Sequence, residues 1–415
     1  MTDVEHDFIF DWNRLKKVAP LARKPFELLD ETLRDGLQSP SVTDPPIEKK
    51  IDLIHLMEDL GIASADIGLP GAGQRAYDDV LALAKEIAQS GMKLQANCAA
   101  RTTIKDIRPI AEISQKAGIP IEVYAFIGSS PIRLFAEDWT VDTLLGHVED
   151  SISFAVKEGL DTCLVTEDTT RSRPDVLDPL FRRVIDLGVR RLCLCDTVGH
   201  ATPDGIKNLF EWAQGLIRGT GEDVLLDWHG HNDRGLGVTN SLHAIEAGAH
   251  RVHGTGLGVG ERVGNASIDQ ILLNLKLLDE WDHDLSKLLD YCQLVSEACE
   301  VPIPYNYPMA GRDAFRTGTG VHAAAIIKAQ KKGDQYLADR VYSGVPAGTF
   351  GRHQEIEIGH MSGVSCVTYW LDSHKLSYDD DLVQAIFGKA KASNRMLKDE
   401  EVFAIIENHR RKNGG

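Results

Sequence analysis

The sequence predicts an α/β fold, a (β/α)8 TIM barrel followed by a mostly helical accessory region. Short apolar runs alternate with amphipathic helical patterns from about residue 26 to about residue 278, and the number and length of these units are typical of such a barrel. Polar, reactive residues follow most of these runs, and in a barrel the carboxyl ends of all strands meet at one face. An open, doubly wound sheet shares the alternation but gathers its site at one switch point. The spread of reactive residues therefore favours the barrel.

The expected strands are short runs rich in apolar residues. In chain order they cover residues 26–29, 63–68, 94–98, 121–126, 163–166, 191–194, 224–228 and 251–252. Segments with helical periodicity lie between them. In one of these, apolar residues recur at helical spacing from Ile47 to Leu60 and the pattern ends at Gly61. Another such segment runs from Asp204 to Leu216. Each expected strand is thus connected to the next through a helix, as parallel strands require.

The pattern changes after about residue 278. A helical segment leads into the proline-rich stretch VPIPYNYPMAGRD, and the sequence ends in the charged, helix-like run KDEEVFAIIENHRRKNGG. We expect an N-terminal extension over residues 1–24, a catalytic barrel over residues 25–280 and accessory subdomains over residues 281–415.

Composition excludes several classes of partner. The formal net charge is -17, and an anionic chain lacks the basic face that a nucleic acid or an anionic membrane would need. The N-terminus has acids where a signal peptide has positive charge, and no apolar run approaches the roughly 20 residues of a membrane span. The seven cysteines are an odd set within mostly apolar surroundings, which indicates reduced thiols and a cytoplasmic protein.

Two histidines stand at the end of the seventh expected strand. His229 and His231 are two residues apart in LLDWHGHNDRGLG, so on a strand both imidazoles point to the same side. Asp35 follows the first strand and reaches the same face. A single histidine is usually structural, but imidazoles and a carboxylate together favour a divalent metal: Zn, Mn, Fe or Co, or Mg with added waters. Asn265 could add an amide oxygen.

Five motifs then carry a resemblance to a known family. In order they are ETLRDGLQ (31–38), TEDTTRS (166–172), DTVGHATP (196–203), HGHNDRGLGVTNSLHAIEAGA (229–249) and GLGVGERVGNAS (256–267). Together they resemble the metal-dependent, acyl-CoA Claisen-condensing family of isopropylmalate, homocitrate and citramalate synthases, which is allied to HMG-CoA lyase in the DRE-TIM metallolyase superfamily. The later segments GTGVHAAAI (318–326) and VYSGVPAGTFGR (341–352) resemble the accessory subdomain of these synthases.

The resemblance implies an acyltransferase that condenses acetyl-CoA with a 2-oxo acid and releases a 2-substituted malate and CoA. It also implies a role for each matching residue. The metal (Mg, Mn, Zn or Co) would be held by Asp35, His229, His231 and Asn265, and Arg34 would stabilise the developing alkoxide. The acid/base pair would be Glu167 and His322, with Tyr342 beside them. The substrate would contact Gln38 and Thr197, and the backbone would approach CoA at Gly256, Gly258 and Gly260.

Plainer interpretations stay open for some of these residues. Arg34 could form a structural ion pair, Thr197 could simply pack after the sixth strand, and Tyr342 could be a core aromatic. His200, His253 and Cys195 are interpreted as structural.

The sequence also departs from the synthase pattern. Thr317 stands where the synthases usually have the first histidine of a His-x-x-x-x-His pair, which leaves His322 alone. RDGLQ is closer to the lyase form of the first motif, whereas the cysteine loop of the lyases is absent. The absent loop argues against a lyase, and the pattern favours the synthase. The alternatives are an HMG-CoA-lyase-like carbon–carbon lyase and, if Thr317 signals a lost site, a homologue that binds metabolite without turnover.

Arg133 bears on the choice of substrate. It follows the fourth strand in SSPIRLF, at a place where homocitrate synthases use an arginine for the distal carboxylate of 2-oxoglutarate. The leading expectation is a 2-oxo acid with an anionic carboxylate or phosphonate tail. The alternative is that Arg133 pairs with Glu137 or Asp138, and that the substrate has a neutral aliphatic or aromatic tail, as in isopropylmalate synthase.

The resemblance carries two further expectations. Accessory segments of the family cross to the partner's barrel, so we expect a homodimer in which His322 and Tyr342 complete the neighbouring site. The sequence ends at Gly415, soon after the accessory segment, and we expect no leucine inhibition through a C-terminal regulatory domain.

Overall fold

The computed structural model describes residues 8–12 and 25–412. The chain divides into two compact units, one ending at Pro302 and the other running from Ile303 onward together with residues 8–12. Each unit is described here by itself. The domain bounds expected from the sequence, 25–280 and 281–415, stay a prediction.

The first unit is the expected barrel. Its eight strands are β1 (Glu27–Asp30), β2 (Ser64–Asp66), β3 (Gln95–Arg101), β4 (Ile121–Gly128), β5 (Thr162–Glu167), β6 (Arg191–Asp196), β7 (Leu225–Gly230) and β8 (Arg251–Gly254). They are parallel, follow one another around the barrel in chain order, and close through β8 pairing with β1. The fold prediction is confirmed, and the open sheet is excluded because β1 and β8 are neighbours.

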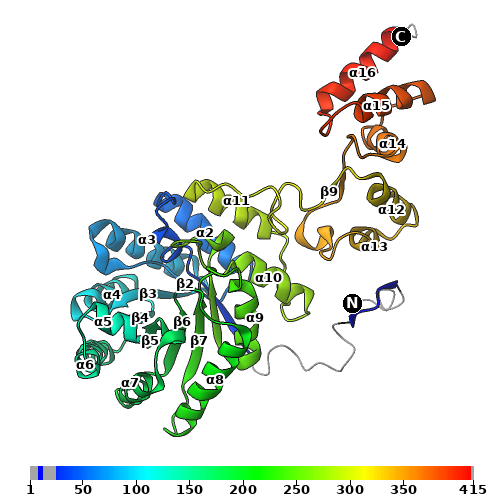
Figure 1. Ribbon diagram of the computed structural model, residues 1–415. Helices are drawn as coiled ribbons and strands as arrows, with labels where there is room; N and C mark the ends of the chain where they lie inside the picture. The colour runs from blue at the N-terminus through cyan, green and yellow to red at the C-terminus, as the bar shows by residue number, and fades with distance from the viewer. Residues whose placement is uncertain (1–7, 13–24, 413–415) are drawn as a thin grey trace. The chain divides into compact units, whose positions relative to one another are not determined.

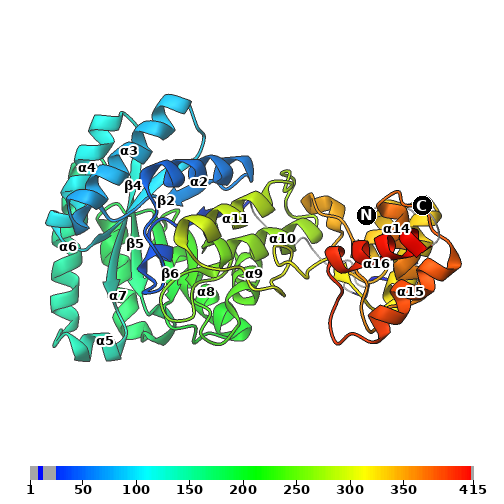
Figure 2. The same ribbon diagram turned by 90° about the horizontal axis from the view of Figure 1, so that it is seen from above.

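The helices surround the strands (Figure 1, Figure 2). They are α2 (Ile47–Asp59), α3 (Gln74–Ser90), α4 (Ile104–Ala117), α5 (Pro131–Ala136), α6 (Val141–Lys157), α7 (Pro174–Asp186), α8 (Pro203–Arg218), α9 (Gly237–Ala247), α10 (Ile268–Leu277) and α11 (Leu288–Cys299). Side chains alternate along the strands between this helical layer and the interior. On β7, for example, the ring of Trp228 packs 6.2 Å from that of Phe210 on α8, whereas His229 faces the interior cavity.

The interior is closed at the amino ends of the strands by buried ion pairs. The guanidinium of Arg251, whose side chain is 1% exposed, lies 2.8 Å from carboxylates of both Glu27 and Glu122 and donates to Oη of Tyr124. Arg191 pairs with Asp227 at 2.7 Å in the same network. These charged groups therefore satisfy one another at the amino ends of the strands.

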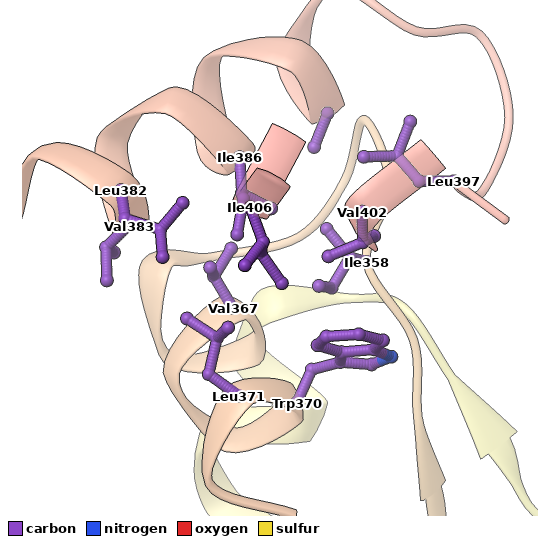
Figure 3. Close-up of a cluster of buried hydrophobic side chains, with 11 residues drawn as sticks. Ile358, Val367, Trp370, Leu371, Leu382, Val383, Ile386, Leu397, Val402 and Ile406 are labelled. Carbon is purple, nitrogen blue, oxygen red and sulfur yellow. The ribbon is translucent and has the colours of Figure 1, made fainter. Parts of the chain in front are cut away.

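The second unit is mostly helical, as expected. It contains β9 (Arg316–Thr317), α12 (Gly320–Lys331), α13 (Gln335–Arg340), β10 (Glu355–Ile356), α14 (Val364–Ser373), α15 (Asp380–Lys391) and α16 (Asp399–Lys412). Its two short strands pair in parallel. Figure 3 shows side chains of α14, α15 and α16, among them Leu371, Ile386 and Ile406, pointing into one apolar cluster. None of the helices within the described ranges is long and apolar enough to span a membrane.

Candidate active site

A cavity of about 230 Å³ lies at the carboxyl ends of the strands. Its polar wall includes most of the residues that the sequence singled out on the barrel: Arg34, Asp35, Gln38, Glu167, Thr197, His229 and His231. Ala99, Phe126 and Val165 add an apolar wall. Residues from seven different strands or the loops after them therefore meet at one face, because parallel strands end there together.

Asp35, His229 and His231 form a group that could hold a metal ion. Nε2 of His231 lies 3.4 Å from Oδ2 of Asp35, and Nε2 of His229 lies 3.7 Å from the same oxygen. All three side chains are buried. Imidazole nitrogens and a carboxylate oxygen gathered this closely suit a divalent ion about 2 Å from each of them.

Asn265 lies beside this group. Its backbone bridges to that of His231, and its Nδ2 donates to Asp35 at 2.8 Å. Oδ1 of Asn265 and Nδ1 of His231 are buried and have no hydrogen-bond partner among the described residues. Buried polar atoms are rarely left without a partner, so these two atoms indicate space for a further polar group or cation. The donor set thus fits the expected divalent metal.

Glu31 is a site residue that the sequence reasoning missed. Its Oε2 lies 2.6 Å from Nδ1 of His229, which leaves Nε2 of that ring toward Asp35. Burial alone would lower the pKa of His229, but Glu31 raises it to about 10. A carboxylate that fixes the second nitrogen of a ligand histidine is typical of metal sites. The sequence contained a signal for Glu31. In ETLRDG this residue directly follows β1, so it lies at the carboxyl ends of the strands, where Asp35 was expected.

His253 was interpreted from the sequence as structural, and in the structure it contacts Glu31. It lines the cavity floor with Nδ1 3.2 Å from Glu31 and Nε2 3.5 Å from Asp227. Glu31, His229 and His253 form a second group close enough to hold a metal. However, the 2.6 Å contact between Glu31 and His229 is the spacing of a direct charge-assisted contact. We therefore interpret Glu31 and His253 as residues that orient the metal ligand His229, and not as ligands of a second metal ion.

Arg34 is held by three carboxylates. Its Nε, Nη1 and Nη2 donate to Asp66, Asp35 and Glu31 at 2.9, 2.7 and 2.8 Å. The structural ion pair weighed as its alternative role is thus present, and its side chain remains 16% exposed at the cavity. Burial raises the pKa of Asp66 to about 6 despite this contact. The arrangement fixes a cation in the cavity wall, next to the candidate metal ligand Asp35.

Arg133 pairs with two carboxylates. Nη2 lies 3.2 Å from Glu137, which is the neighbour weighed from the sequence, and Nε lies 2.9 Å from Oε1 of Glu167. This second ion pair was not anticipated. Burial raises the pKa of Glu167, and the positive charge of Arg133 opposes that rise. The binding of a substrate tail by Arg133 stays a prediction.

Thr197 takes part in a network at the mouth of the cavity. Its Oγ1 accepts from the backbone N of Asp168 at 2.9 Å, and its carbonyl oxygen accepts from Nη2 of Arg262. Arg262 also makes two hydrogen bonds to Asp233, at 2.9 and 3.0 Å. Because Oγ1 accepts within the protein, the Thr197 hydroxyl proton remains available for a substrate acceptor.

The glycines of the loop after β8 have a packing role in the protein itself. A Cβ at Gly256 would lie 2.7 Å from Oη of Tyr291, and one at Gly260 would lie 2.6 Å from Nδ2 of Asn265. Gly258 has a φ of +66°, a left-handed conformation that favours glycine. These residues let the loop fold against Asn265, and their contact with CoA stays a prediction.

His322 and Tyr342 belong to the second unit. Their rings stack with centroids 4.0 Å apart, and Tyr342 is 50% exposed, so it is not a core aromatic. Thr317 lies on β9 of the same unit. The structure therefore brings His322 and Tyr342 together, whereas their part in the barrel site stays a prediction.

Known proteins resemble this chain over most of its length. Residues 25–296 match the HMGL-like family model. The chain is 28% identical to homocitrate synthase AksA of Methanopyrus kandleri, over 91% of each protein. It is 27% identical to 2-isopropylmalate synthase of Lactococcus lactis subsp. cremoris, over 94% of this chain and 75% of that protein.

Among solved structures, the HMG-CoA lyase of Bacillus subtilis superimposes with a TM-score of 0.56 at 22% identity, over 68% of this chain and 96% of that one. This likeness supports the barrel fold. With the family match extending from the start of β1 into α11, the chain belongs to the HMGL-like family.

Proposed function

We propose that the protein is an acyltransferase that condenses acetyl-CoA with a 2-oxo acid carrying an anionic tail and releases a 2-substituted malate and CoA. Relatives named homocitrate synthase and 2-isopropylmalate synthase support the reaction class. The observation that carries the proposal is the convergence of Asp35, His229 and His231 on one buried point beside the fixed cation of Arg34. Glu167 lines the same cavity.

The proposed chemistry follows from these positions. A divalent metal held by Asp35, His229, His231 and Asn265 would supply Lewis acidity toward the keto group. Arg34 stabilises negative charge on the former keto oxygen, since its guanidinium is already fixed and needs no reorganisation. Glu167 takes a proton from the acetyl methyl group, and the new carbon–carbon bond joins that carbon to the keto carbon. Water then cleaves the thioester and releases CoA.

Other residues have supporting roles in the proposal. The Thr197 hydroxyl and Gln38 bind the substrate carboxylate, while His322 and Tyr342 from a partner subunit return a proton to the former keto oxygen. We include a homodimer for this reason. All seven cysteines are buried free thiols, which supports a cytoplasmic location.

One observation favours a neutral tail as a second candidate. The cavity has an apolar wall of Ala99, Phe126 and Val165, and Arg133 is already paired with two carboxylates. An aliphatic 2-oxo acid would fit against that wall, as in a 2-isopropylmalate synthase.

The test is a free-thiol assay with metal-loaded protein, acetyl-CoA and a panel of 2-oxo acids. The panel contains 2-oxoglutarate, 3-phosphonopyruvate and 2-oxoisovalerate, and mass spectrometry identifies each product. We expect thiol release that depends on the 2-oxo acid and is fastest with an anionic tail. Fastest release with 2-oxoisovalerate would favour the second candidate. Cleavage of 3-hydroxy-3-methylglutaryl-CoA without any condensation would replace the synthase by a lyase.

A further inference from the structure

Arg133 and Glu167 form an ion pair for which the backbone makes room. Gly128, the last residue of β4, lies directly opposite Glu167 on β5. Arg133 on α5 folds back over this glycine, and a Cβ at Gly128 would lie 2.9 Å from its Nε. Any larger residue would therefore push the guanidinium away from Glu167. The pair is thus built into the end of two neighbouring strands.

From this geometry we infer that Arg133 restrains the carboxylate of Glu167 before substrate binds and releases it when the anionic tail of the 2-oxo acid takes over the guanidinium. The inference rests on the proposed function, since it assigns Glu167 the proton transfer and the substrate an anionic tail. It deepens that function by making tail recognition and activation of the base one event.

Two other arginines that follow barrel strands are held more firmly. Arg171 makes two 2.7 Å hydrogen bonds to Asp168, and Arg262 makes two to Asp233. Arg133 instead makes one contact with each of its two carboxylates, and its side chain is 37% exposed. Bidentate pairs are stronger than single contacts. Of these three arginines, Arg133 is therefore the one whose guanidinium an incoming carboxylate or phosphonate displaces most easily from its partners.

The exchange changes the charges around Glu167. The tail adds one negative charge beside Arg133, and Glu167 loses its contact with the cation. The charges that face Glu167 are Arg133 and the carboxylates of Asp168, Glu137 and Glu261. Once Arg133 is neutralised by the tail, the remaining neighbours all favour proton uptake by Glu167. A neutral tail leaves the ion pair between Arg133 and Glu167 intact. Substrates with anionic and neutral tails should therefore differ in kcat as well as in KM.

Competition for Arg133 gives a test in binding alone. We would titrate metal-loaded wild type and Glu167→Gln by calorimetry with 2-oxoglutarate and with 2-oxohexanoate, in which a terminal methyl group takes the place of a distal carboxylate oxygen and the second charge is missing. Glu167→Gln should bind 2-oxoglutarate about two- to five-fold more tightly, as expected for removing one partly exposed competing ion pair. Its affinity for 2-oxohexanoate should not change.

Glu261→Gln is the matched control. Glu261 faces Glu167 and lines the cavity, and its ion pair is with Arg262 rather than Arg133. The Glu261→Gln substitution also removes one negative charge, but it leaves Glu167 in competition for Arg133. It should therefore not tighten the binding of 2-oxoglutarate. Equal tightening in Glu261→Gln and Glu167→Gln, or no tightening in Glu167→Gln, would overturn the inference.

A pH profile supplies a second readout. Arg133→Gln removes the cation that lowers the pKa of Glu167, so the acidic limb of kcat for 2-oxohexanoate should move to higher pH. If the acidic limb of the pH profile does not move, Arg133 does not restrain Glu167 and the inference is wrong. The proposed function fails separately, if wild type releases no thiol with any 2-oxo acid, whatever the binding data show.

Discussion

Oε2 of Glu31 lies 2.6 Å from Nδ1 of His229, on the edge of the imidazole opposite to the nitrogen that faces Asp35. The carboxylate thereby fixes the orientation of a candidate metal ligand. Glu31 is itself held by Arg34 at 2.8 Å and by His253 at 3.2 Å. The proposed metal site is thus anchored in the charged interior of the barrel, and this anchoring can be tested.

Glu31→Gln should weaken metal binding about 10- to 100-fold, since the amide keeps the size of the side chain but not the charge that orients His229. Competition with a fluorescent chelator measures the change. Glu122→Gln is the control, because it breaks an ion pair with Arg251 at the other end of the barrel. An unchanged metal affinity in Glu31→Gln would show that His229 needs no such support.

Removal of the metal should abolish thiol release. Chelation followed by gel filtration gives metal-free protein, and Mg²⁺, Mn²⁺, Zn²⁺ or Co²⁺ is then added back. We expect activity to return with at least one of these ions, because the polarisation of the keto group depends on the ion. Full activity in protein shown to be metal-free by elemental analysis would contradict the proposed mechanism.

Arg133→Ala should discriminate between substrates. We expect kcat/KM for an anionic 2-oxo acid to fall about 5- to 30-fold, which is the loss of one charged contact reduced for its partial exposure. For 2-oxoisovalerate the value should hold or rise, because the substitution removes a cation beside an apolar tail. Steady-state kinetics on both substrates measure this.

The alternative role of Arg133 makes a different forecast. If it only stabilises α5 through Glu137, the losses should be small, similar for both substrates and accompanied by a lower Tm. Equal losses on both substrates would end the anionic-tail interpretation.

Asp30 should make stability depend on pH. Burial raises its pKa to about 6, although Thr32 and Tyr291 donate to it. Between the unfolded value of 3.8 and 6, the folded state keeps a proton that the unfolded state loses. Stability therefore falls as pH rises through this window, by roughly 3 kcal/mol for two pKa units.

The measurement compares metal-free wild type with Asp30→Asn by urea unfolding from pH 4 to 7. The amide mimics the protonated carboxyl, so the free energy of unfolding of the variant should increase relative to that of wild type as pH rises. Asp52→Asn, at an exposed position on α2, is the control for removing a carboxylate elsewhere in the barrel unit. A constant difference between Asp30→Asn and wild type would show that Asp30 titrates normally.

A shared site should allow subunits to complement each other. Asp35→Asn and His322→Ala are each expected to be nearly inactive alone. After subunit exchange the mixture should recover up to about a quarter of the wild-type activity, because about half of the dimers are then heterodimers and each of these has one of its two sites complete. Subunit exchange followed by the thiol assay tests this. A protein that stays monomeric and active at nanomolar concentration would refute the dimer.

The sequence by itself determined the barrel and the face that carries the site. The alternation of strand and helix patterns is local, and parallel strands necessarily bring their carboxyl ends to one edge. The spacing of His229 and His231 follows from the two-residue period of a strand in the same way. Asp35 could be placed with them for that reason, without knowledge of any side-chain contact.

The tertiary structure decided how charges within that face are paired. Glu31 and Asp66 both bind Arg34, and Arg133 reaches Glu167 across Gly128 rather than only Glu137 on its own turn. These pairings join residues of different strands and depend on register and on which side-chain conformations the neighbours leave open. A sequence pattern records which residue types meet at a barrel face, whereas the closed sheet sets the distances that choose their partners.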